Sequence, residues 1–262
     1  MCGICGQFTF NGRETSTRCV EKMTDALQRR GPDAKGLFVQ GAAALGHRRL
    51  KIIDLSERAH QPMVDNDLGL SIIFNGAIYN YPDLRQDLED KGYVFFSSGD
   101  TEVILKAYHA WGRDCVRRFN GMFAFAVYER DRGRLFLARD RLGIKPLYYR
   151  KSARDVRFAS SLPALIAGGG IDGAIDPVAL HHYMTFHSVV PAPHTILQDV
   201  RKLPPGETMT VDARGMIEKD CYWKLDFGPR AEERRYGLPE WRDLVRDALR
   251  RAVRRRLTAD VP

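Results

Sequence analysis

A predicted β-hairpin constrains the fold of this 262-residue chain more than any other feature. Its two arms, GMFAFAVYER at 121–130 and GRLFLARD at 133–140, are apolar and rich in aromatic residues, as strands often are. The sequence RDRG, which joins them, is a turn signal. Two further segments have the same strand-like character, CGICGQFTF at 2–10 and GLSIIFNGAIYNY at 69–81. We therefore expect sheets of mainly antiparallel strands.

Helical patterns lie between and after these strands, at 17–28, 81–93, 100–112 and 176–186. The last of them begins with an Asp-Pro pair, in which Asp176 is the expected N-cap and Pro177 the first helical residue. Helices grouped between antiparallel strands predict an α+β fold, in which layers of sheet are flanked by helices.

The end of the sequence indicates a linker and then an amphipathic helix. Residues 226–240 combine proline, glycine and charges, and WRDLVRDALRRAVRRRL at 241–257 repeats apolar residues at helical spacing. The arginines of this helix carry much of the formal net charge of +8. Such a basic face is usually solvated, and nucleic-acid or membrane binding is the alternative. The apolar stripe leads us to expect a packing partner outside this sequence.

Composition and the number of cysteines narrow the class of protein to which this chain can belong. A hydrophobic content of 44% with 28% charged residues is typical of a globular chain. No apolar run approaches the roughly 20 residues of a membrane span, and the first residues do not resemble a secretory signal. The five cysteines are odd in number and irregularly spaced, which argues against a disulfide framework. We expect a cytoplasmic protein that binds neither membrane nor nucleic acid.

Cys2, which follows the initiator methionine directly, is the first candidate for chemistry. Removal of Met1 would leave one residue with a thiol and a free α-amine, a nucleophile and its base together. The α-amine has an ordinary pKa of about 7.7–8.0, close enough to neutrality to accept the thiol proton. A chance cysteine and a CxxC pair with Cys5 are the alternatives. A second cysteine pair for a metal site is absent from the sequence.

Three other places supply groups that a cysteine hydrolase needs. Asn75 and Gly76 could donate two neutral hydrogen bonds to an oxyanion, or simply form an Asn-Gly turn. Arg48 and Arg49, placed before a predicted strand, could hold a carboxylate or lie on the surface. Asp100, at a helix start, could pair with an ammonium group or cap the helix.

Four of the seven histidines, His47, His60, His181 and His182, show no metal-like spacing and are interpreted as structural.

Taken together, these segments resemble the glutaminase domain of the asparagine synthetase family, which are class II glutamine amidotransferases. The resemblance covers residues 1–225 and follows the family's order. It rests on MCGI at the start, RRGPD at 29–33, HRRLKIIDL at 47–55, QPM at 61–63, FNGAIYNY at 74–81, SSGDTEVIL at 97–105, NGMFAFAVY at 120–128, RDRLGIKPLYY at 139–149 and FASSLPAL at 158–165.

The resemblance implies an N-terminal nucleophile hydrolase fold, a four-layer αββα sandwich of mainly antiparallel sheets. It makes Cys2 the catalytic nucleophile and Asn75 and Gly76 the oxyanion hole. Arg49 would hold the α-carboxylate of glutamine, and Asp100 its α-ammonium.

The resemblance also implies that the backbone of an Arg49–Ile53 strand lines the pocket, so Leu50, Ile52 and Ile53 are expected substrate-binding residues. Ala77 is expected there too, although it replaces a glutamate of the common family pattern NGEIYN. Ser161 likewise replaces the acid of FASE. At both positions the sequence is similar to the branch of the family known as N-acetylglutaminylglutamine amidotransferase.

The family's second domain uses ATP and Mg²⁺ and receives ammonia through an internal channel. Its S-G-G-x-D-S loop has no match here, because GGGIDG at 168–173 lacks both serines and is interpreted as a surface turn. We therefore expect residues 226–262 to be the linker and first helix of an absent synthetase domain. The expected partners are glutamine and that synthetase domain, and a homodimer is a further possibility. Asparagine synthetase itself and a non-catalytic regulator are the alternative functions.

Overall fold

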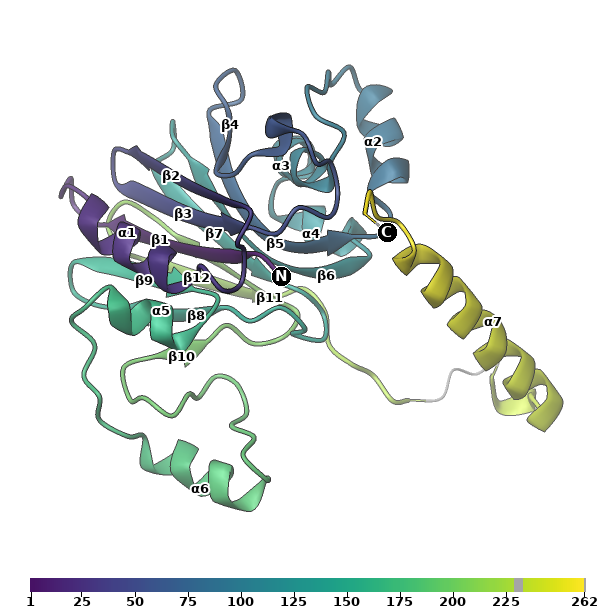
Figure 1. The fold of residues 1–262 in the computed structure, drawn as a ribbon. Coiled ribbons are helices and arrows are strands. Elements are labelled where there is room, and N and C mark those ends of the chain that lie inside the picture. Colours follow the sequence, from purple (N-terminus) through teal and green to yellow (C-terminus); the bar gives the residue numbers. More distant parts are fainter. Residues whose placement is uncertain (229–232, 262) are drawn as a thin grey trace.

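Two six-stranded sheets lie face to face between layers of helices (Figure 1) in the computed structural model, which describes residues 1–228 and 233–261. The first sheet has the order β10-β8-β9-β1-β3-β2 and the second the order β12-β11-β7-β6-β5-β4. All strand pairs in both sheets are antiparallel. This is the predicted four-layer α+β sandwich of an N-terminal nucleophile hydrolase.

The strands of the first sheet are β1 (Gly3–Thr9), β2 (Ala34–Gln40), β3 (Ala43–Arg49), β8 (Tyr148–Lys151), β9 (Asp155–Ala159) and β10 (Arg201–Lys202). Those of the second are β4 (Met63–Asp65), β5 (Leu70–Ile78), β6 (Gly121–Glu129), β7 (Arg134–Arg139), β11 (Glu207–Val211) and β12 (Ile217–Cys221). The α-helices are α1 (Thr17–Ala26), α2 (Tyr81–Glu89), α3 (Asp100–Trp111), α4 (Cys115–Arg118), α5 (Leu162–Ala167), α6 (Pro177–Thr185) and α7 (Leu238–Arg256). Short 3₁₀ helices span Glu57–Ala59, Gly112–Asp114 and Glu233–Arg235.

Three apolar layers separate the four structural layers. The middle layer lies between the sheets, and the outer two lie under α1 with α5 and under α2 with α3 and α4. Alternation along β5 creates two of them, because Ile73 packs between the sheets while Ile72 and Phe74 face the helices. A strand that is apolar on both sides is thus buried on both sides.

The predicted hairpin is confirmed. Strands β6 and β7 pair from Ala124 with Arg139 to Glu129 with Arg134, and the turn closes with a bond from the N–H of Gly133 to the carbonyl of Arg130. The predicted helices are confirmed as well, and the side chain of Asp176 caps α6 by accepting hydrogen bonds from two N–H groups of its first turn.

The strand expected at Arg49–Ile53 is wrong. Strand β3 ends at Arg49, and the segment from Leu50 to Asp54 is irregular. Both β1 and β2 pair with β3 only as far as Arg48 and Arg49, so the following residues have no strand to pair with. Apolar composition alone does not make a strand without such a neighbour. Arg48 and Arg49 therefore end a strand instead of preceding one.

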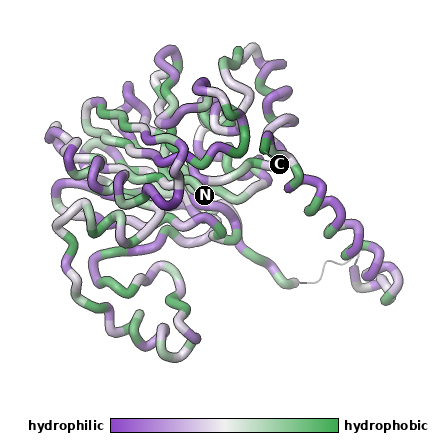
Figure 2. The backbone as a smooth tube through the Cα atoms, in the orientation of Figure 1, coloured by the Kyte–Doolittle hydropathy of each residue, from purple (hydrophilic) through white to green (hydrophobic). Residues whose placement is uncertain are grey.

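The predicted C-terminal helix is present as α7, which projects from the sandwich (Figure 1). It begins at Leu238, inside the predicted linker, because Gly237 is its N-cap and Pro239 suits a first turn. Residues 229–232 of that linker lie outside the described residues. Figure 2 shows hydrophobic residues interspersed with hydrophilic ones along α7. Its apolar side chains are exposed, Leu249 by 62% and Val253 by 58%.

Candidate active site

One cavity of about 480 Å³ is lined by all nine site residues that the sequence predicted. They are Cys2, Arg49, Leu50, Ile52, Ile53, Asn75, Gly76, Ala77 and Asp100. They come from the start of β1, the end of β3 and the loop after it, the end of β5 and the start of α3. Residues far apart in the sequence are therefore gathered at one end of the two sheets.

Cys2 lies immediately before β1, with its sulfur against the backbone of Leu50. The N–H of Leu50 donates to Sγ at 3.4 Å, and Sγ lies 3.7 Å from the Leu50 carbonyl. Burial raises the pKa of the Cys2 thiol, and the Leu50 hydrogen bond, the terminal amine and Arg49 oppose that rise. The sulfur thus has a donor and cations nearby that favour its thiolate.

Asn75 carries an unused hydrogen-bond donor in this cavity. Its side chain is buried, yet Nδ2 has no hydrogen-bond partner within the part of the chain that the structure describes. Leaving a buried amide donor unpaired is costly, and such donors often mark places where a ligand supplies the acceptor. Gly76 follows in close contact with β6, where an added Cβ would lie 2.2 Å from the Met122 carbonyl oxygen. Only glycine fits this position without movement of the strand.

Asp100 is a buried carboxylate at the first residue of α3. The N-cap is Gly99, and Oδ2 of Asp100 instead accepts a hydrogen bond of 3.0 Å from the N–H of Ile78. The side chain therefore joins α3 to the end of β5. Burial raises its pKa to about 6, while hydrogen bonds from backbone N–H groups and the charge of Arg49 act against this.

Arg49 organises the irregular loop that follows it. One terminal nitrogen of its guanidinium donates to the carbonyl of Ser56 at 3.0 Å, and the other donates to the carbonyls of Ile53 and Asp54. This wrapping explains why the chain leaves the sheet at this point. A guanidinium has five N–H donors, so some remain for a ligand in the cavity.

The cavity also contains residues that the sequence did not single out. Among them are Lys145 and, from the end of the described chain, Arg256, Thr258 and Ala259. Lys145 lies within RDRLGIKPLYY, one of the segments on which the family resemblance rests, so the sequence already marked this segment as part of the domain. No sequence pattern predicted that the residues after α7 line the cavity, because this contact depends on the path of the chain after the helix.

The C-terminal segment from Arg256 to Asp260 is held against the cavity by specific contacts. The N–H of Asp260 donates to the carbonyl of Ile52 at 2.9 Å, and its carboxylate accepts from the N–H of Asp54 at 2.7 Å. The guanidinium of Arg256 lies 4.8 Å from the ring centre of Tyr79. This segment therefore forms one wall of the cavity.

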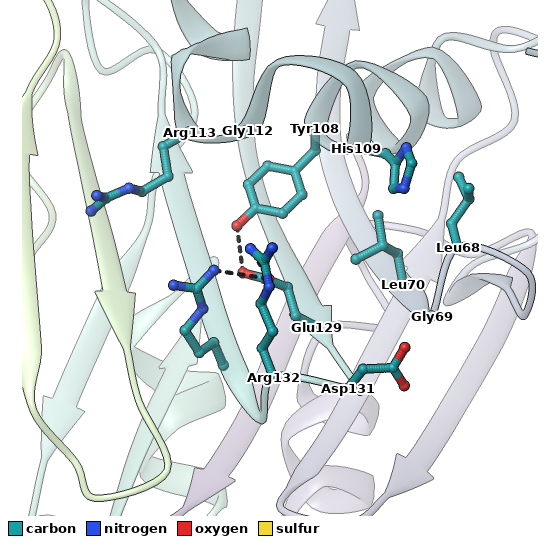
Figure 3. A pocket seen from close by; sticks show the side chains of 11 residues that line it. Leu68, Gly69, Leu70, Tyr108, His109, Gly112, Arg113, Glu129, Asp131 and Arg132 are labelled. Carbon is teal, nitrogen blue, oxygen red and sulfur yellow. Dashed lines mark hydrogen bonds and ion pairs between the residues drawn. The ribbon is translucent and has the colours of Figure 1, made fainter.

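A second cavity of about 600 Å³ lies away from these residues, between α3 and the β6–β7 hairpin (Figure 3). Its buried carboxylate, Glu129, accepts from the hydroxyl of Tyr108 at 2.8 Å and pairs with Arg134 at 3.0 Å and Arg132 at 3.4 Å. The carboxylate of Glu129 is thus already paired with arginines, and the lining of the cavity has no cysteine, serine or threonine. The chemistry expected of a nucleophile therefore belongs to the first cavity.

Within residues 1–228 and 233–261, no cluster of three or more His, Cys, Asp or Glu side chains could hold a metal ion. The five cysteines are free, and His47 is buried against the carbonyl of Phe74 at 3.1 Å. No helix in the described ranges is both long and apolar enough to cross a membrane.

The chain is similar to several known proteins. Residues 1–223 match the family described as "Glutamine amidotransferase domain". The whole chain is 38% identical to "Asparagine synthetase [glutamine-hydrolyzing] 1" of Bacillus subtilis, of which it covers 41%. It is 31% identical to "Amidase chry2" of Gibberella zeae, of which it covers 40%. The chain thus spans about half or less of the length of these curated relatives.

The fold is similar to that of a glutamine phosphoribosylpyrophosphate amidotransferase from B. subtilis. The TM-score is 0.64 at 21% identity, over 86% of this chain and 50% of the other. At this identity the likeness shows the fold.

Proposed function

The chain belongs to the glutamine amidotransferase domain family, with asparagine synthetases among its homologues, and on that premise we propose that Cys2 hydrolyses the carboxamide of glutamine to glutamate and ammonia. The observation that carries the proposal is the buried, unpartnered Nδ2 of Asn75 in the cavity that Cys2 lines. A tetrahedral intermediate would offer this donor an oxyanion. Measuring glutamate release by the purified chain tests the proposal.

The proposed reaction proceeds through a thioester. The sulfur of Cys2 attacks the carboxamide carbon, and the thiol proton passes to the α-amine of Cys2, which is free once Met1 is removed. Asn75 and Gly76 donate hydrogen bonds to the oxygen that becomes negative. The amine returns the proton to the leaving nitrogen, so ammonia departs. Water then attacks the thioester, which releases glutamate and restores the thiol.

The proposed substrate is held at its amino-acid end by opposite charges. Arg49 would bind the α-carboxylate, and Asp100 the α-ammonium. The Leu50, Ile52 and Ile53 segment forms the side wall between this end and Cys2. The support is that these groups line one cavity with Cys2, and that Asp100 is buried and carries no ion pair among the described residues.

We expect glutamine binding to weaken in acid because of Asp100. Its pKa of about 6 means that the carboxylate becomes protonated as the pH falls through 6, and a neutral acid does not pair with ammonium. The KM for glutamine should rise by about tenfold per pH unit below this point, with kcat less affected. In Asp100→Asn the KM should already be raised, by about tenfold or more at pH 7.5, and its rise in acid should disappear. An unchanged pH profile of KM in Asp100→Asn would contradict the assignment.

Ala77 offers a gain-of-affinity test. It lines the cavity next to Ile78, whose N–H binds Asp100, so a glutamate at 77 would place a second carboxylate at the ammonium end. Ala77→Glu should lower the KM for glutamine by about tenfold with little change in kcat, because one charge-assisted hydrogen bond is worth roughly 1.5–3 kcal/mol. Ala77→Gln is the matched uncharged control. Equal KM values for the two variants would show that the ammonium lies elsewhere.

For the longer protein, we propose that ammonia passes through a channel to a C-terminal synthetase domain that amidates a carboxylate with ATP and Mg²⁺. In this proposal residues 1–225 form the glutaminase domain, and residues 226–262 the linker and first helix of the synthetase domain. Ala77 and Ser161 favour N-acetylglutaminylglutamine as the acceptor, and aspartate is the alternative. Amide formation by the full-length protein with each acceptor in turn would decide between them. A cytoplasmic location and a homodimer stay predictions.

A further inference from the structure

A lysine is buried at the cavity end where Cys2 lies. Lys145 is only 4% exposed, and it lines the same cavity as Met1 and Cys2. Its ammonium Nζ donates to the sulfur of Met1 at 3.3 Å. The amino group that becomes free when Met1 is removed belongs to the next residue, so this ammonium lies beside the start of the mature chain.

The loop that carries Lys145 is held firmly. The carboxylate of Asp140 accepts hydrogen bonds from the N–H groups of Phe123 at 3.1 Å, Ile144 at 2.9 Å and Lys145 at 2.9 Å. The guanidinium of Arg139 donates to the carbonyl of Lys145 at 2.8 Å. The backbone of Lys145 is therefore fixed from both sides, and its side chain cannot leave the cavity with a moving loop.

The positive charge of Lys145 has no direct counter-ion. In the part of the chain that the structure describes, no carboxylate forms an ion pair with it. A second cation, Arg30, approaches from the turn after α1, where its Nε donates to the carbonyl of Cys2 at 3.1 Å. The Nη2 of Arg30 is buried without a hydrogen-bond partner. Two cations thus lie at the start of the chain, Lys145 beside the Met1 side chain and Arg30 at the carbonyl of Cys2.

The other charged groups around Cys2 are few. Arg49 adds a positive charge near the thiol, while Asp100 and Asp33 are the acidic neighbours of the thiol and of the terminal amine. Asp100 accepts a hydrogen bond from the N–H of Ile78 and would pair with the ammonium of glutamine, and Asp33 accepts from the N–H of Lys51 at 2.8 Å. The immediate surroundings of the nucleophile are therefore cationic.

We propose that Lys145 is a positioning residue whose buried ammonium, together with Arg30, favours the thiolate of Cys2 and the neutral form of the adjacent α-amine. This inference rests on the proposed hydrolysis of glutamine, in which the neutral amine takes the thiol proton as Cys2 attacks and then gives it to the leaving nitrogen. A cation stabilises a neighbouring thiolate and makes a neighbouring ammonium group a stronger acid, so Lys145 favours both the nucleophile and the later proton transfer to the leaving nitrogen.

The titration behaviour of the neighbouring groups agrees with this role. Burial lowers the pKa of the Met1 amine, the group next to Cys2 in the chain before Met1 is removed. The charge of Cys2 opposes this, and the cations Arg30 and Lys145 lower the pKa further. Burial and Arg30 lower the pKa of Lys145, whereas Cys2 and Asp140 raise it. The charge of Cys2 thus acts on the ammonium of Lys145.

Alkylation of Cys2 tests the inference without requiring turnover. The rate of iodoacetamide modification of Cys2, followed against pH by peptide mass spectrometry, reports the thiolate. In Lys145→Met the midpoint should rise by about one pH unit, and Lys145→Arg should restore it towards wild type. Lys202→Met is the matched control, because Lys202 is a part-buried lysine whose pKa is lowered by burial, and it does not line the cavity. Its midpoint should equal that of wild type.

Glutaminase kinetics give the second readout. The acid limb of kcat/KM should move upward by about one unit in Lys145→Met and not in Lys202→Met. Lys145→Gln replaces the methionine variant if the latter melts early. A folded, neutral variant with the wild-type alkylation midpoint would overturn the inference. If wild type releases no glutamate while the alkylation midpoint still shifts, the proposed function fails and the role of Lys145 stands.

Discussion

Replacing Cys2 with alanine should reduce glutamine hydrolysis by roughly a thousandfold or more, because no other group in the cavity supplies a thiolate. Alanine is also small, so Met1 removal and the free α-amine are retained and only the sulfur is lost. Glutamate release by a coupled assay is the measurement. Cys221→Ser, which changes an exposed cysteine outside the cavity, should keep wild-type activity. Wild-type rates in Cys2→Ala would eliminate the proposed nucleophile.

Asn75→Ala should lower kcat by about a hundredfold to a thousandfold with little change in KM. The physical reason is that its amide would meet an oxygen that becomes negative only as the reaction proceeds, and one such donor is worth about that factor. The melting temperature should change little, because Nδ2 of Asn75 has no hydrogen-bond partner among the described residues to lose.

A matched control for this variant is Asn66→Ala, at an exposed asparagine outside the cavity. It should match wild type in both kcat and KM. If Asn75→Ala changed KM alone, the amide would be binding the substrate in its ground state, and the oxyanion role would be wrong.

The layers of the fold could be predicted from local sequence because their signals are local. The apolar arms at 121–130 and 133–140 and the turn between them signal a hairpin within twenty residues of sequence, although the neighbouring strands β5 and β11 stabilise it. Asp176 followed by Pro177 starts a helix for reasons contained in those two residues. The similarity to an amidotransferase structure then confirms how these elements are stacked.

The loop after β3 could not be predicted in the same way. The residues after Arg49 are apolar enough to suggest a strand, but the edge that would pair with them is absent. Their path is decided by the guanidinium of Arg49, which gathers carbonyls from Ile53 to Ser56. The contact between Asp54 and Asp260 joins positions 206 residues apart, and no local pattern announces it.

The site residues illustrate the same limit. Residue type and motif were enough to suggest Cys2, Asn75 and Asp100 as site residues. The structure adds their burial and their hydrogen-bond partners, which the sequence does not reveal. Burial raises the pKa of Asp100 to about 6, and the orphaned donor of Asn75 depends on every group around it. Lys145 lies within a segment that the resemblance covers, but a lysine is usually exposed, and only the packing shows that this one is buried.

Labelling with an electrophilic glutamine analogue tests the central claim most directly. The wild-type chain, incubated with a glutamine-like diazoketone and analysed by intact and peptide mass spectrometry, should lack Met1 and carry one adduct, on Cys2. Excess glutamine should slow the labelling, and an uncleaved N-terminal tag should prevent it by blocking the α-amine. An unlabelled Cys2, or an adduct on Cys221 that forms at the same rate with and without glutamine, would contradict the account.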